Sequence, residues 1–141
     1  MPLTKPTGYT LLLENGSLLS PADATTYHAG SFSAAGATTN AAQRRVYIPR
    51  TGTIRACQLY FLNGGTLGSN ETSTVSIRLN NTTDTTVSAA VTNDALSTTF
   101  SNSALGVAVV AGDYIELKWV TPTWATNPTS VRYSAVVFVE I

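Results

Sequence analysis

Apolar and polar residues alternate along most of the chain, which is the period of a β-strand with one buried face. The clearest case is 74–79, where Val75, Ile77 and Leu79 point one way and the residues between them point the other. The same alternation runs through 114–120 and through 131–141. No long stretch keeps the 3.6-residue period of an amphipathic helix. The sequence therefore predicts an all-β protein.

Further short strands, and the loops between them, predict how the sheets are arranged. The apolar pattern also places strands at 25–29, 44–48, 53–62, 86–91, 97–102 and 105–110. About eight short strands separated by turns are typical of a sandwich or a barrel. The loops are rich in Gly, Ser, Thr and Asn, which favours a jelly roll over an up-and-down barrel. We expect one jelly-roll β-sandwich that occupies residues 25–141.

Residues 1–24 differ from the rest because several prolines prevent a continuous helix or strand ladder there. Between the prolines lies an apolar stretch with no clear period, which is either a strand tucked onto the domain or an extended arm. We favour an extended N-terminal arm over 1–24 that orders on a partner surface. The arm residues expected to contact that partner are Leu11, Leu12, Leu13, Leu18 and Leu19.

The last expected strand carries apolar residues on both faces. Its first face is the regular apolar one, whereas Val136 and Phe138 lie on the face that a monomeric sheet would turn to water. Two adjacent apolar residues on that side indicate either an interface between protomers or a covering loop or arm. We name Val136 and Phe138 as candidate protomer-interface residues and leave both explanations open.

Composition narrows the class of partner. Charged residues make up 11% of the chain, and eight basic residues balance eight acidic ones. A general nucleic-acid binder needs a basic face, so we expect no nucleic-acid partner. Low charge gives a free monomer little electrostatic repulsion, which suits a protein packed against copies of itself. No apolar run is long enough to span a bilayer and no signal peptide is evident, so we expect cytoplasmic synthesis and no membrane partner.

Candidate chemistry is sparse. The single cysteine, methionine and histidine exclude a disulfide framework and a Cys/His zinc site. His28 is the only histidine in the chain. Cys57 lies on the apolar face of an expected strand, so we expect it to be a core residue. Asp113 and Glu116 are close in sequence, but Asp113 belongs to a Gly-Asp turn that its side chain is expected to cap. We therefore predict no catalytic, cofactor-binding or metal-binding residues, and no enzymatic activity.

Aromatic and basic residues leave two further possibilities. Trp119 is expected in the core, while Trp124 lies in a loop between prolines and could anchor the loop or contact a ligand. Four arginines cluster around one expected strand and its turn. These side chains either contact acidic groups on a partner or are ordinary solvent-exposed charges. We favour the second explanation. These arginines are Arg44, Arg45, Arg50 and Arg55.

Two segments carry a family resemblance. The segment 74–83, with the sequence TVSIRLNNTT, and the segment 111–128, which contains PTWATNP, resemble small jelly-roll modules of tailed-bacteriophage virion proteins. The resemblance covers about two-thirds of the chain and omits residues 1–24. It implies a homotrimeric structural protein of the virion, made in the host cytoplasm.

The resemblance implies two competing roles. The first is a capsid decoration (cement) protein that binds the major capsid protein on the outer surface of the shell and stabilises it. The second is a receptor-binding or fibre-tip module that recognises a host-surface glycan. A single small jelly roll with a leading arm and no shaft fits the decoration role better.

Overall fold

The computed structural model of the chain describes residues 8–29, 38–69 and 71–141, and these contain ten strands and one short 3-10 helix. The strands are β1 (Gly8–Leu19), β2 (Thr26–Ala29), β3 (Val46–Tyr47), β4 (Gly52–Gly64), β5 (Thr72–Leu79), β6 (Thr83–Thr92), β7 (Ser97–Asn102), β8 (Val107–Val109), β9 (Tyr114–Val120) and β10 (Ser130–Glu140). The 3-10 helix η1 covers Ala41–Arg44. The all-β prediction is confirmed.

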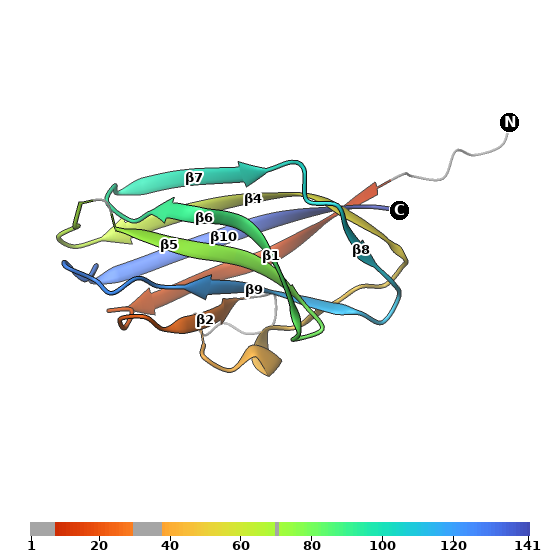
Figure 1. Ribbon diagram of the computed structural model, residues 1–141, viewed down its shortest axis with the longest axis horizontal. Helices are drawn as coiled ribbons and strands as arrows, with labels where there is room; N and C mark the ends of the chain where they lie inside the picture. Colours follow the sequence, from red (N-terminus) through yellow and green to blue (C-terminus); the bar gives the residue numbers. More distant parts are fainter. Residues whose placement is uncertain (1–7, 30–37, 70) are drawn as a thin grey trace, which may run out of the picture.

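The strands form two antiparallel sheets that stack as the layers of a sandwich (Figure 1). We call the sheet ordered β1-β10-β4-β7, with β8 also paired to β4, sheet A. Sheet B has the order β2-β9-β5-β6, with β3 also paired to β9. Early strands pair with late ones in nested order, so that β1 meets β10, β2 meets β9, β4 meets β7 and β5 meets β6. This nesting is that of one long antiparallel ribbon rolled into two sheets, which is a jelly roll.

The structure corrects the predicted N-terminal arm over most of its length. Residues 8–19 form β1, which pairs with β10 from Gly8↔Glu140 to Leu19↔Ser130, with a register shift between Leu13 and Gly16. Of the two alternatives open for this segment, the strand is the observed one. Pairing satisfies backbone groups that an arm would leave to water, and it makes this segment the first strand of the roll. Residues 1–7 lie outside the described part of the chain.

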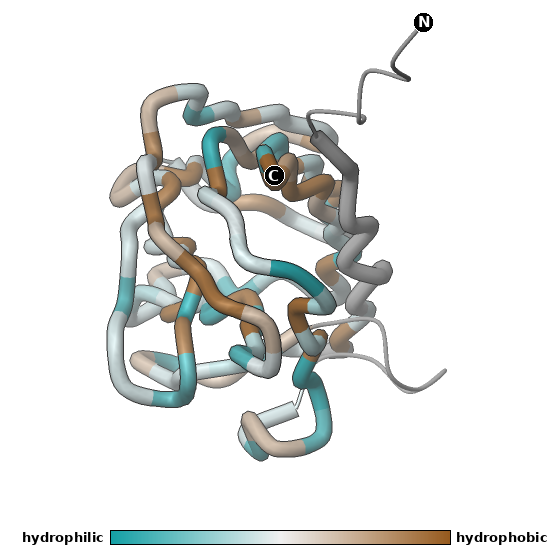
Figure 2. Tube along the Cα trace, turned by 90° about the vertical axis from the view of Figure 1, so that its right-hand side faces the viewer, coloured by the Kyte–Doolittle hydropathy of each residue, from teal (hydrophilic) through white to brown (hydrophobic). Residues whose placement is uncertain are grey.

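The expected strand at 44–48 is shorter than predicted. Asn40 precedes η1 and its side-chain Oδ1 accepts a hydrogen bond from the backbone N–H of Ala42, at 3.1 Å. This capping turns the chain into a helical turn up to Arg44, so that only Val46 and Tyr47 pair with β9. Figure 1 shows the η1 segment below β2 and β9, and in the turned view of Figure 2 the chain likewise projects at the bottom of the molecule.

A cluster of aromatic residues lies in the core between the sheets. Trp119 from sheet B is 1% exposed and meets Phe61 and Tyr133 from sheet A, with ring centroids 5.9 and 5.4 Å apart. Phe61 and Tyr133 stack on each other, and Tyr27 closes the cluster against Trp119. Because aromatic side chains bury large areas, this contact contributes to the hydrophobic stabilisation between the two layers. The predicted core position of Trp119 is confirmed.

Candidate functional site

The outer face of sheet A carries a cluster of exposed apolar side chains. Val136 is 38% exposed and Phe138 is 42% exposed on β10, and Tyr60 is 40% exposed on the neighbouring strand β4. In the register between these strands, Tyr60 is opposite Ser134, which places its ring diagonally beside Val136. We call Tyr60, Val136 and Phe138 the sheet A patch.

The local sequence explains why these residues face outward. Ala135, Val137 and Val139 alternate with them and are buried in the core, at 1% exposure or less. Since side chains alternate faces along a strand, the residues between them must face away from the core. The predicted outward orientation of Val136 and Phe138 is therefore confirmed, whereas their role at a protomer interface stays a prediction.

The sheet A patch has a polar border. Arg55 on β4 and Glu140 at the end of β10 form an ion pair, with Nε and Oε2 2.5 Å apart and both side chains about half exposed. Arg132 is exposed at the other end of β10. An apolar centre with a charged rim is the usual anatomy of a protein–protein contact.

The outer face of sheet B is different, because it holds a buried charge network. Glu116 is 0% exposed and lies 3.9 Å from Nδ1 of His28 and 3.8 Å from Nε of Arg78. Burial raises the pKa of the Glu116 carboxyl, and Arg78 and Arg45 oppose that rise. Burial also lowers the pKa of His28, and the nearby charges of Arg78 and Lys118 lower it further. Each group is therefore pushed towards its neutral form.

Asp84 on β6 completes this network at its solvent edge. Its carboxylate accepts from Arg78 at 3.1 Å and from Lys118 at 2.5 Å, so it joins three strands of sheet B. Neither His28 nor Glu116 is open to a substrate, since they are 6% and 0% exposed. Their geometry therefore favours a structural role over acid–base chemistry.

Two carboxylates hold the loop that contains Trp124. Oδ1 of Asp23 accepts from the backbone N–H of Trp124 at 3.0 Å, and Oε1 of Glu71 accepts from the N–H groups of Ala125 and Thr126. Glu71 is buried, and charge-assisted hydrogen bonds of this kind are strong. Trp124 is 8% exposed, so of its two predicted roles the structure places it as a loop anchor. The sequence gives no sign of the partnership between positions 23, 71 and 124.

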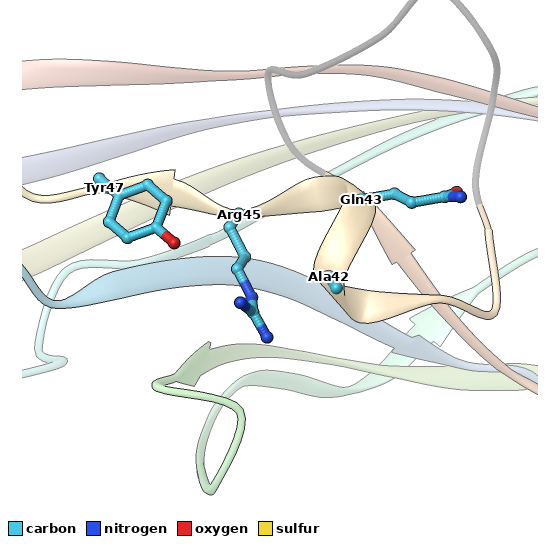
Figure 3. Close-up of a pocket in the computed structure, with 4 residues that line it drawn as sticks. All are labelled: Ala42, Gln43, Arg45 and Tyr47. Carbon is cyan, nitrogen blue, oxygen red and sulfur yellow. The ribbon is translucent and has the colours of Figure 1, made fainter.

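A second surface feature lies beside η1 and β3. A hollow of about 210 Å³ is lined by Ala42, Gln43, Arg45 and Tyr47 (Figure 3). The guanidinium carbon of Arg45 lies 4.3 Å from the centre of the Tyr114 ring, which is a cation–π contact. Tyr47 is 60% exposed, and its ring centre is 5.5 Å from that of Tyr114.

The four arginines named from the sequence do not form one cluster. Arg44 is buried in η1, and Arg45 contacts Tyr114 at sheet B. Arg50 is exposed in the turn before β4, and Arg55 pairs with Glu140 on sheet A. The chain passes from one sheet to the other between positions 47 and 52, and this separates them.

The structure also locates the other sequence candidates. Leu18 is partly buried against the core, which ties it to its own domain. The side chains of Leu11, Leu12, Leu13 and Leu19 lie outside the described part of the structure.

Cys57 is buried in the core as predicted, and burial raises its pKa to about 12. Asp113 caps its turn by accepting from the N–H of Val110 at 2.8 Å. The hydrogen bonds from Asn80 and Val110 hold the pKa of Asp113 low.

Two whole-molecule observations complete the description. Within residues 8–29, 38–69 and 71–141, no group of three or more His, Cys, Asp or Glu side chains is placed to hold a metal ion. Among the helices in these same ranges, none has the length and apolar character needed to cross a membrane.

Comparison with known proteins identifies the fold. No protein-family model and no curated protein sequence match the chain. The jelly-roll fold of this chain is similar to that of chains in two solved virus structures. A chain of the cyanophage Pam1 capsid asymmetric unit matches with a TM-score of 0.58 and 14% identity, over 100% of this chain and 91% of that one. A chain of infectious bursal disease virus, Gx strain, matches with a TM-score of 0.53 and 15% identity, over 98% of this chain but 32% of that one.

Proposed function

We propose that this chain is a structural protein of a virion and, more specifically, a bacteriophage decoration protein. In this proposal it binds as a homotrimer to the outside of the shell of major capsid protein and stabilises that shell. The observation that supports it best is the match to the Pam1 capsid chain along nearly the full length of both chains. At 14% identity that match shows the fold, so the role rests on the family resemblance of residues 74–83 and 111–128 as well.

The sheet A patch supplies the contact that assembly requires. Phe138, Val136 and Tyr60 present apolar surface with a charged border, and aromatic residues at the centre of a patch are typical anchors of an interface. In the proposed trimer this patch is covered by a neighbouring protomer. The three protomers of one trimer then bind the shell simultaneously, so that individually weak contacts to the capsid protein give a high overall affinity.

Shell reinforcement needs a module that resists deformation, and the fold provides one. The two sheets are joined by the aromatic cluster around Trp119, and β1 is paired to β10 along its length. Antiparallel pairing and a close-packed core transmit strain with little local movement. The mechanism is therefore adhesive, with the work done by surfaces on a stiff sandwich.

Co-sedimentation tests this proposal. The purified protein is mixed with expanded, undecorated heads of the virus that encodes it, and in parallel with host cells. Sedimentation with heads, and an increase in the temperature at which the heads release DNA, are the expected results. Sedimentation with cells alone would instead establish the receptor-binding role, and turnover of a surface glycan would establish an enzyme. Phe138→Asp serves as the matched variant, because loss of the trimer should also lose the avidity for heads.

A further inference from the structure

We propose that the hollow lined by Arg45 and Tyr47 is a binding site for a carboxylate side chain on an acidic segment of a partner protein. The residues of this site (Figure 3) lie in and around η1 and β3, and β3 pairs with sheet B, whereas the sheet A patch lies on the other sheet. The proposal does not depend on trimer formation, and it does not require that the partner be a capsid protein.

Arg45 lies over an aromatic ring and keeps an unpaired hydrogen-bond donor. Its guanidinium carbon lies 4.3 Å from the centre of the Tyr114 ring, and this cation–π contact holds the group beside the hollow. Stacking uses the face of a guanidinium and leaves its N–H donors along the edge. Among the described residues, the buried Nε of Arg45 has no hydrogen-bond acceptor. A carboxylate matches this donor edge in geometry and in charge.

Tyr47 forms the second wall of the site. Tyr47 is 60% exposed, so its ring is open to a ligand. The Tyr47 and Tyr114 rings are tilted by 55° with their centres 5.5 Å apart, so Tyr114 supports both the guanidinium and the exposed ring. The aliphatic part of a glutamate side chain can pack on Tyr47 while its carboxylate reaches Arg45.

The charges around the hollow favour an anion. Arg45, Arg78 and Lys118 carry three positive charges at this face of sheet B. Asp84 is already shared between Arg78 and Lys118, and Glu116 is fully buried beneath them. The charge of Arg45 also acts on the buried Glu116 carboxyl, but among the described residues Arg45 forms no ion pair, so it is the cation that can meet a ligand at the hollow.

The size of the hollow and the number of cations beside it favour a protein segment over a nucleic acid as the ligand. One oriented arginine beside a hollow of about 210 Å³ suits a single side chain. A nucleic-acid groove needs a row of cations to displace counterions, and this chain has zero net charge. The partner that fits is an acidic peptide segment bound through one carboxylate at a time.

Peptide titration monitored by NMR tests the site. A short peptide of alternating glutamate and glycine is added to the full chain with labelled tyrosine rings, and a peptide with glutamine in place of glutamate is the control. Saturable shifts of the Tyr47 and Tyr114 signals are expected with the glutamate peptide only. These shifts should weaken as salt is added, because the contact is electrostatic. Equal shifts with both peptides, or no saturable shift, would overturn the proposal.

Two variants and one competing ligand sharpen the outcome. Arg45→Gln should weaken binding about tenfold or more, as expected for loss of a charge-assisted bidentate contact. Arg50→Gln is the matched control, because Arg50 is an exposed arginine a few residues away that does not line the hollow. Tyr47→Ser should also weaken binding of the glutamate peptide. Because Tyr47 is exposed, this variant tests the site even if Arg45→Gln perturbs the fold. Equal losses at Arg45 and Arg50, or tighter binding of a sialylated oligosaccharide than of the peptide, would contradict a specific peptide site.

Discussion

Phe138 offers the most quantitative test of the assembly surface. Its side chain is 42% exposed in the single chain. Aromatic side chains bury roughly 200 Å² when fully enclosed, so an interface would cover about 85 Å² of this residue. At about 25 cal/mol per Å² that area contributes about 2 kcal/mol for each protomer. Truncation to alanine should therefore weaken each protomer contact by about 30-fold.

Sedimentation velocity over a range of protein concentrations measures this effect. The wild-type chain should sediment as a trimer, and Phe138→Ala should shift the transition to monomer to higher concentration. Phe138→Asp should give monomer or aggregate, since it would bury an unpaired carboxylate. Near-ultraviolet circular dichroism checks that the monomer still folds, which we expect because the residue points away from the core.

The control and the refuting result are equally specific. Tyr47→Ala removes an exposed aromatic side chain from the opposite sheet, so it should leave the trimer intact. A Phe138→Asp variant that assembles like the wild type would show that the sheet A patch is not a protomer contact. A wild-type chain that stays monomeric at every concentration would remove the trimer altogether.

Three further predictions concern the interior. Folding lowers the pKa of His28 below its ordinary value of 6.5. The unfolding free energy should therefore fall as the pH drops below 6.5, because the unfolded chain then binds a proton that the folded chain does not. Urea unfolding should show a steeper fall for the wild type than for His28→Gln, and identical pH profiles would refute the assignment. Glu71→Gln should lower the unfolding free energy by about 1–3 kcal/mol, because the buried Glu71 carboxylate accepts two part-buried backbone N–H groups, whereas Glu140→Gln at an exposed ion pair should change it by less than about 1 kcal/mol. Cys57 should react with a thiol reagent only at the rate of unfolding, because burial raises its pKa to about 12, and rapid labelling of the native protein would contradict its core position.

The alternation of apolar residues predicted the strands because it is a local signal. The expected strand 97–102 coincides with β7, and 74–79 lies inside β5. The same signal placed Val136 and Phe138 on the outer face and Cys57 and Trp119 in the core, as observed. Period-two patterns succeed here because one face of each sheet is buried.

Features set by distant partners could not be predicted in this way. Residues 8–19 have no clear period, and pairing with β10, far along the chain, decides that they form a strand. Glu116 lies on the polar face of its strand, yet it is fully buried under groups from other elements. The anchoring of Trp124 depends on Asp23 and Glu71, neither of which is near it in sequence. Only the tertiary structure brings these residues together.

The most direct test of the proposed function is a difference map from cryo-electron microscopy. Virions of the virus that encodes this chain are compared with virions from which its gene has been deleted. The account predicts trimeric density on the outer surface of the shell that is lost on deletion, with the sheet A patches turned towards one another. Density lost from the tail tip, with an unchanged shell, would contradict it.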